Sequence, residues 1–466
     1  MLEILKDKSN RNLIIITTLS SFMTAFMGSS INVALPMIGR EFNTSTMLLS
    51  WLATAYIMTT AVLLIPIGRM TDILGRTKFF KSGIIVFTIG SFLCGIAGNA
   101  TSLLIFRLLQ GIGASLIFST ATSILVSAIP PQKRGQVLGI NITSVYTGLL
   151  LGPTLGGVIS EKLGWRYIFY FNIIIGVIIV VISFLKLKQD WIEAKNEKFD
   201  FIGSIIFMIA LVLLMLGFTF VPSITGFAMI LGGTIIFFSF VLIEKRTTHP
   251  VVNINIFKTN KTFTFSNLAA LINYSATFAI GFLMSLYLQN IKNFTPSKTG
   301  LILAVQPLFM ALFSPFAGKL SDKIEPQKIA SAGMGLITII LIVLGFINQD
   351  FNIYFIITGL GILGIGFALF SSPNTNAVMS SVEKKYYGIA SSILSSVRLC
   401  GQMFSMGFVI VIFSLLLGSK QQISGGGEGN FILSIKIAFW IFAFLCFIGI
   451  FASLARGKIH TGEEEY

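Results

Sequence analysis

Two arginines inside long apolar runs are the residues of this chain best suited to chemistry. Arg107 lies within 101–123 and Arg398 within 387–414. A guanidinium in such a run is costly unless it faces water, a polar partner or a ligand, and it binds carboxylates and phosphates well. We expect both to face a cavity and bind a ligand's anion or hydrate a neutral ligand's polar end. The alternative is that they hold backbone carbonyls and neighbours such as Gln110 and Gln402.

Other polar residues in these runs are candidates for lining the same cavity. Each could equally make an interhelical hydrogen bond worth about 1 kcal/mol. They are Asn32, Tyr56, Gln110, Asn141, Asn273, Gln306 and Asn374.

Acidic residues are missing from the middle of every apolar run. The chain has 18 Asp and Glu and 2 His, and His249 and His460 fall in polar segments. A buried carboxylate with a raised pKa is the usual proton carrier. Proton coupling would therefore be indirect, through the substrate or a peripheral acid such as Asp72, or absent.

An enzyme is the least favoured class. It would need a clustered nucleophile, metal site or acid/base pair, and the sequence shows no such spacing. Cys94, Cys400 and Cys446 stand singly in apolar runs and are expected to pack. We expect no metal and no cofactor, and no nucleic-acid partner, because the basic residues are spread over many short segments.

Composition requires a membrane. Hydrophobic residues make up 54% of the chain and charged residues 11%, and fourteen apolar stretches are each about 20 residues long. If the N-terminus is cytoplasmic, basic residues favour the cytoplasmic segments by about four to one. The net charge of +15 is thus a topology signal. The sequence predicts an all-α multi-pass protein of the plasma (cell) membrane with both termini cytoplasmic and the first run retained as a helix.

A charged turn occurs twice. Gly68–Lys78, which contains Asp72 and Arg76, recurs in altered form 250 residues later as Gly318–Lys328, which contains Asp322. Two related halves around a central site are a common design of secondary transporters. We expect one six-helix bundle over 1–190, linkers with an inserted hairpin (201–220 and 225–243) over 191–262, and a second bundle over 263–466. We expect a monomer, with dimer contact through the hairpin left open.

The fifth run places Gly148, Gly152 and Gly156 on one helix face. That face permits close backbone approach, and Pro153 allows a bend. Plain packing and gating are both consistent with this pattern.

These motifs together resemble the major facilitator superfamily, specifically its fourteen-helix drug:proton antiporter branch, over almost the whole chain. The matching stretches are Gly68–Lys78, Arg107–Gly113, Gly148–Gly157, Asn32–Pro36, Trp165–Phe169 and His249–Pro250. The resemblance implies alternating access by two rocking bundles. It also implies that Asp72 closes the cytoplasmic side at a helix N-terminus of the opposite half, with Arg76 bonded nearby.

One departure bears on the driving force. The branch carries an aspartate five residues before Asn32, and this chain has Met27 there. The leading prediction is a multidrug-type exporter of small amphipathic molecules, anionic or neutral, embedded in the lipid bilayer, with proton coupling left open. The alternative is a narrower carrier of an organic anion or a lipid-like molecule.

Overall fold

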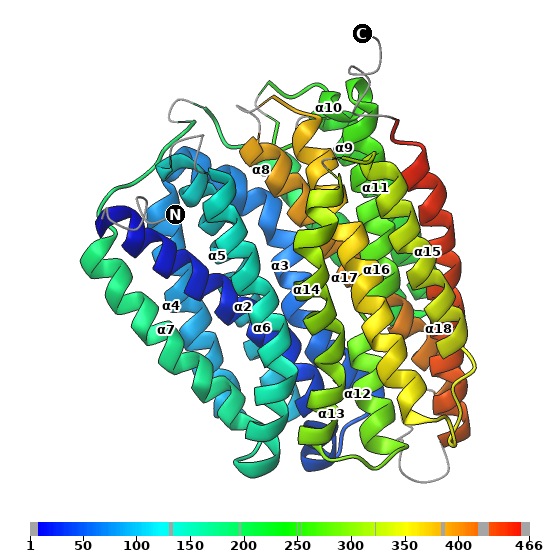
Figure 1. Cartoon of the computed structure of the whole chain (residues 1–466). Coiled ribbons are helices and arrows are strands. Elements are labelled where there is room, and N and C mark those ends of the chain that lie inside the picture. Colours follow the sequence, from blue (N-terminus) through cyan, green and yellow to red (C-terminus); the bar gives the residue numbers. More distant parts are fainter. Residues whose placement is uncertain are drawn as a thin grey trace. The chain divides into compact units, whose positions relative to one another are not determined.

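The computed structural model describes residues 8–129, 134–194, 197–248, 250–252, 254–321, 323–383, 387–417 and 428–457. Within these ranges the regular structure is helical, and fourteen helices are long and apolar enough to cross a membrane. This confirms the predicted all-α membrane fold (Figure 1). Asp322, a predicted gating residue, lies outside the described residues.

The helices follow one another in this order: α2 (Lys8–Phe42), α3 (Thr46–Leu74), α4 (Arg76–Gly95), α5 (Ala100–Ala128), α6 (Arg134–Lys162), α7 (Arg166–Lys186), α8 (Phe201–Phe220), α9 (Ile224–Glu244), α10 (Asn255–Thr259), α11 (Lys261–Thr277), α12 (Ile280–Asn290), α13 (Pro296–Leu303), α14 (Val305–Ser321), α15 (Pro326–Leu344), α16 (Ile353–Ser380), α17 (Tyr387–Leu416) and α18 (Glu428–Leu454).

Two spans that the sequence predicts as continuous are interrupted. The run expected over 263–289 is split into α11 and α12, and the Ala279 amide in the break donates to Ser405 Oγ at 3.0 Å. The run expected over 298–318 is split at Ala304 into α13 and α14. Hydropathy does not detect such breaks, because it reports only apolar length.

The helices group into two compact units. The first contains residues up to Val212 together with Gly233–Val252 and Phe294–Ala304. The second contains Leu213–Gly232, Asn253–Asn293 and the residues from Val305 onward. The inserted hairpin is shared between them, and the predicted boundaries at 190 and 262 stay a prediction.

The two copies of the charged turn begin with the same local structure. Thr71 Oγ1 donates to the Gly68 carbonyl at 2.8 Å, and Ser321 Oγ donates to the Gly318 carbonyl at 2.7 Å. The repeated stretch begins in the last turns of α3 in the first unit and of α14 in the second, and these helices pack on α5 and α16 respectively. The described start of the two copies therefore shares its helical position and one hydrogen bond.

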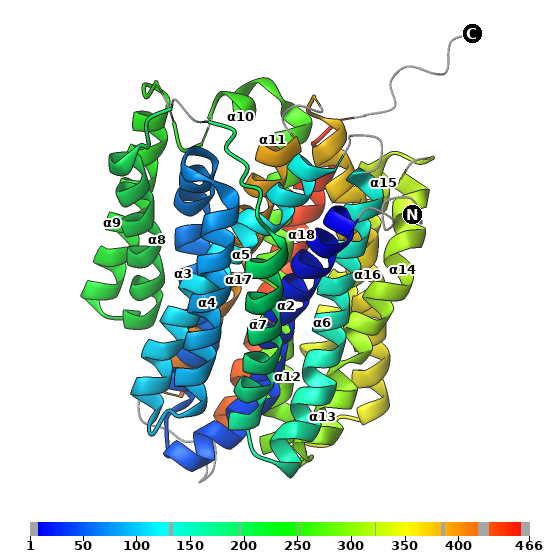
Figure 2. The same ribbon diagram turned by 90° about the vertical axis from the view of Figure 1, so that its left-hand side faces the viewer.

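The glycine face of α6 packs directly against α2, and both views show the two helices side by side (Figures 1 and 2). A Cβ added at Gly148 would lie 2.7 Å from the Phe22 carbonyl oxygen, and one at Gly156 would lie 2.8 Å from Ser30 Cβ. At Gly152 it would overlap Ser29 Oγ. The small residues thus set the spacing of these two helices.

The inserted hairpin, α8 and α9, matches its predicted bounds within a residue. In the second unit its tip packs on α17, where the Phe218 ring lies 6.2 Å from Phe404 and 6.1 Å from Phe408. Ser414 Oγ donates to the Val221 carbonyl at 2.9 Å. The hairpin therefore makes specific contacts through aromatic packing and a backbone hydrogen bond.

Replacing Gly152 by alanine should lower the thermal unfolding midpoint of the purified protein. The added methyl has no room beside Ser29, and overpacking costs about 1–3 kcal/mol. Gly139→Ala on the same helix is the matched control, because nothing lies within 4 Å of its added Cβ. Equal midpoints for the two variants would contradict the close packing of α2 and α6.

Candidate functional site

Arg107 is the centre of a polar cluster buried in the first unit. Its side chain on α5 is 1% exposed. Nη1 donates to Gln110 Oε1 at 2.6 Å, and Nε donates to the Leu52 carbonyl at 3.2 Å. The guanidinium lies over the Tyr56 ring, 4.5 Å from its centroid. The charge is thus balanced by a carbonyl, an amide and an aromatic face.

The partners of Arg107 are themselves held in place. Gln110 Nε2 donates to Ser91 Oγ on α4 at 2.8 Å, and Tyr56 OH donates to the Thr24 carbonyl at 3.4 Å. Arg107 Nη2 is buried and has no hydrogen-bond acceptor among the described residues. This arrangement matches the expected alternative of carbonyl and amide partners, while leaving one N–H edge for water or ligand.

Arg398 forms a similar centre in the second unit. Nη2 donates to Thr375 Oγ1 on α16 at 2.5 Å, and the guanidinium lies 5.6 Å from the Tyr274 ring centroid on α11. In the described parts of the chain its buried Nε has no acceptor, and the side-chain amides of Asn273 and Asn374 have no partner. Asn273 and Asn374 directly precede Tyr274 and Thr375, so they lie at the same level of the bundle.

The two centres share one chemistry, an arginine over a tyrosine with neutral hydrogen-bond partners. Buried polar atoms are rarely left unpaired in folded proteins, so the unpaired atoms at both centres distinguish them from ordinary packing. Two other candidates from the sequence are half-buried: Asn32 on α2 in the first unit, and Gln306 on α14 in the second.

A groove between α2 and α6 was not anticipated from the sequence. Its volume is about 860 Å³, within the range of drug-sized sites. Its lining is apolar with several hydroxyl groups and no charge: Thr18, Leu19, Phe22, Gly139, Ile140, Thr143, Ser144 and Thr147. The sequence feature that could have indicated this groove is the four-residue spacing of Thr143 and Thr147, which places both hydroxyl groups on one face of α6.

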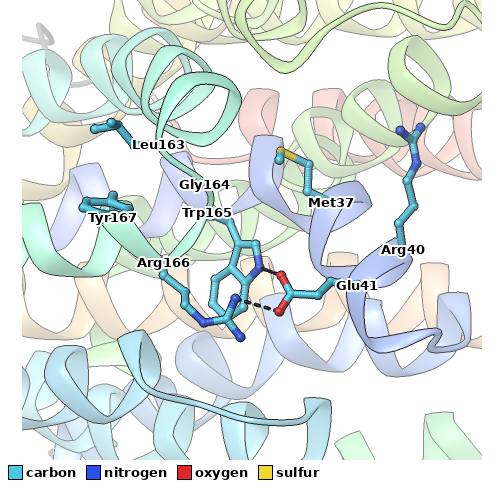
Figure 3. A pocket seen from close by; sticks show the side chains of 8 residues that line it. All are labelled: Met37, Arg40, Glu41, Leu163, Gly164, Trp165, Arg166 and Tyr167. Atoms are coloured by element: carbon cyan, nitrogen blue, oxygen red, sulfur yellow. Dashed lines mark hydrogen bonds and ion pairs between the residues drawn. The ribbon is translucent and has the colours of Figure 1, made fainter.

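A second cavity, of about 480 Å³, lies at the far end of α2 (Figure 3). Glu41 there accepts a hydrogen bond from Trp165 Nε1 at 2.6 Å and pairs with Arg166 Nη1 at 2.6 Å. Arg166 also donates to the Ala97 carbonyl at 3.1 Å and stacks on the Trp165 ring at 4.3 Å. These contacts hold α2, α7 and the turn after α4 together.

The charged turn Gly68–Lys78 is bonded to the linker that follows α7. Asp72 Oδ1 accepts from Arg76 Nε at 2.8 Å and from Nη2 at 2.6 Å, while Arg76 also reaches the Ser123 carbonyl at 3.2 Å. The Asp72 carbonyl accepts from the amides of Glu193 and Ala194. The predicted bond between Arg76 and nearby groups is thus present, and closure by Asp72 against the opposite half stays a prediction.

Gly75 makes this turn sterically feasible. Its φ of 110° lies in the region that favours glycine, and an added Cβ would overlap the Asp190 carboxylate. Asp190 Oδ1 accepts from the Thr77 amide at 2.8 Å, which satisfies a free donor in the first turn of α4. The linker therefore serves as a cap for α4.

Arg456 is a buried cation, which in the sequence counted only among the basic residues that indicate membrane orientation. It follows α18 and is 0% exposed, and Nε and Nη2 donate to Ser453 O and Oγ at 2.9 and 2.6 Å. Burial lowers the pKa of its guanidinium to about 10. It remains charged at neutral pH, held by the carbonyl end of its own helix.

Comparison with known proteins agrees with this architecture. The family model "Major Facilitator Superfamily" matches residues 17–246 and 267–464. The riboflavin transporter RibZ of Clostridioides difficile is 31% identical over 94% of this chain and 95% of its own length. The multidrug resistance protein Stp of Mycobacterium tuberculosis is 29% identical over 85% of this chain and 74% of its own.

A solved structure shares the fold. The inward-facing, unoccupied crystal structure of a bacterial homologue of the human lysosomal transporter Spinster has a TM-score of 0.70 at 16% identity, covering 97% of each chain. The family match and these relatives define a membrane transporter and not an enzyme. The chain belongs to the major facilitator superfamily.

Arg107→Ala should destabilise the fold. It leaves Gln110 Oε1 without this donor, and an unsatisfied buried group costs about 1–3 kcal/mol; it also removes the second donor of the Leu52 carbonyl, which lies within α3. Thermal unfolding in detergent measures this. Arg11→Ala, an exposed arginine on α2, should change the midpoint little. If Arg107→Ala unfolds at the wild-type temperature, the cluster is not a structural centre.

Proposed function

We propose that the chain exports small amphipathic molecules, neutral or anionic, by alternating access across the cell membrane. The observation that supports this most is the groove between α2 and α6, which offers an apolar wall, hydroxyl groups and about 860 Å³ of space. Such a lining accepts many ligands because it demands few specific hydrogen bonds. The proposed orientation places both termini in the cytoplasm.

The charges of the buried centres support the substrate class. Arg107 and Arg398 each have neutral partners, and the described ion pairs with acids involve neither of them. Buried positive charge repels a cation in a medium of low dielectric constant and attracts an anion or the negative end of a dipole. Neutral and anionic ligands are therefore favoured over the cationic drugs that membrane acids commonly balance.

A narrower carrier is the second candidate, and the RibZ relative is the reason for it. Riboflavin is a neutral, flat heteroaromatic molecule with a polyol chain. Unpaired amides such as Asn273 and Asn374 suit such a hydrogen-bonding ligand. The multidrug resistance protein Stp supports the broader proposal.

Transport into proteoliposomes at a clamped membrane potential separates the two. The broad exporter should move several unrelated neutral or anionic amphiphiles, and each should compete with the others. Movement of riboflavin alone would favour the narrow carrier. Accumulation that follows an imposed pH gradient with a non-titrating substrate would assign proton coupling to the protein, through a peripheral acid such as Asp72. If coupling appears only with titratable substrates, the proton travels on the substrate.

Filling the groove should stop export without unfolding the protein. Thr143→Trp places an indole among the lining residues, and we expect at least a tenfold loss of transport rate with an unchanged unfolding midpoint. Ile142→Trp is the matched control, because Ile142 is adjacent on α6, is exposed and does not line the groove. Equal rates for the two variants would remove the groove from the transport path.

A further inference from the structure

A short helix from the second half of the sequence is held against the first. The predicted span over 298–318 is divided, so that α13 belongs to the first compact unit while α14 belongs to the second. The reason is the contact between α13 and α6, which both views show as neighbours (Figures 1 and 2).

Glycines bring the two backbones together. A Cβ at Gly157 would lie 2.5 Å from the Pro296 carbonyl oxygen, and one at Gly300 would overlap the Pro153 carbonyl. Neither position has room for a side chain. Gly157 and Pro153 lie beside the glycine face that packs on α2, so α6 makes two close contacts in different directions.

A carboxylate completes the contact. Glu161 Oε2, on the last turn of α6, accepts the backbone N–H of Ser297 at 2.9 Å, and Thr295 Oγ1 accepts that of Lys298 at 3.3 Å. Together they satisfy two free donors in the first turn of α13. An acid at the N-terminus of a helix is favourable, whereas the same acid at the C-terminal end of its own helix is not. The position of Glu161 is thus explained by α13 and not by α6.

We infer that Glu161 is a positioning residue of the transport cycle, an electrostatic latch that holds α13 on α6 when the outer side is closed. The inference rests on the proposed alternating access and on the proposed cytoplasmic N-terminus, which places this end of α6 outside. Opening to the outside must separate a second-half helix from α6, so the Glu161–Ser297 bond must break in every cycle. Because Glu161 is exposed, its charge is screened and the latch is weak enough to release.

Spin labels at two exposed positions measure the latch. Leu163→Cys follows α6 and Leu301→Cys lies on α13, in a background in which Cys94, Cys400 and Cys446 are replaced by alanine. In nanodiscs, the distances between the two spin labels should be mainly short in the protein that retains Glu161. The ratio of long to short distances should rise about two- to fivefold in Glu161→Gln and further in Glu161→Lys.

Controls separate charge from shape. Asp350→Asn also removes an exposed acid, from the turn before α16, and should leave the distribution unchanged. Raising the salt concentration should shift the Glu161 protein toward long distances and leave Glu161→Gln unaffected, because only a charge is screened. A wild-type distribution in both the Gln and Lys variants, or a salt response that survives in Glu161→Gln, would overturn the latch.

The distances are measured without substrate, so this test fails independently of the proposed function. If the Glu161 variants showed an unchanged distance distribution and the protein exported normally, only the proposed latch would be rejected. If the distances responded as expected but the protein exported none of the tested amphiphiles, only the proposed substrate class would be rejected.

Discussion

The cost of burying positive charge without an acid determines how this transporter is built. Arg107 is stabilised by three weak, neutral interactions, with a carbonyl, an amide and a tyrosine ring face. A carboxylate would neutralise it more strongly and would also repel anionic ligands. Arg398 over Tyr274 repeats this solution in the second unit. Neutral partners therefore stabilise the fold while the centres stay electropositive, and the proposed substrate class rests on this.

Close helix contacts at small residues complement these centres. Gly152 lets α6 touch α2, and Gly157 lets it touch α13. Such contacts gain van der Waals packing in lipid without a large hydrophobic driving force. The charged groups are placed at helix ends, where Asp72 meets Arg76 on one side and Glu161 meets Ser297 on the other. In the proposed cycle the α2–α6 contact stays closed, whereas the α6–α13 contact must open.

Much of the fold could be predicted because apolar length and repeated turns are local properties of the sequence. The fourteen spans, the hairpin bounds and the shared geometry at Gly68 and Gly318 follow from them. The break at Ala304, the α2–α6 groove and the pairing of Arg398 with Thr375 instead of Gln402 could not. These depend on which helix faces meet, and a single sequence does not specify that. The absence of acids from the middle of the apolar runs was visible from the sequence, whereas the tyrosine beside each arginine required the structure.

Ligand charge tests the central claim most directly. A matched series on one amphipathic scaffold, ending in a carboxylate, a neutral amide or an ammonium group, can be titrated calorimetrically against the purified protein at low salt. The account predicts that the carboxylate and amide ligands bind more tightly than the ammonium ligand, and that Arg107→Gln and Arg398→Gln reduce the difference. Tightest binding of the ammonium ligand would contradict an electropositive, acid-free transport path.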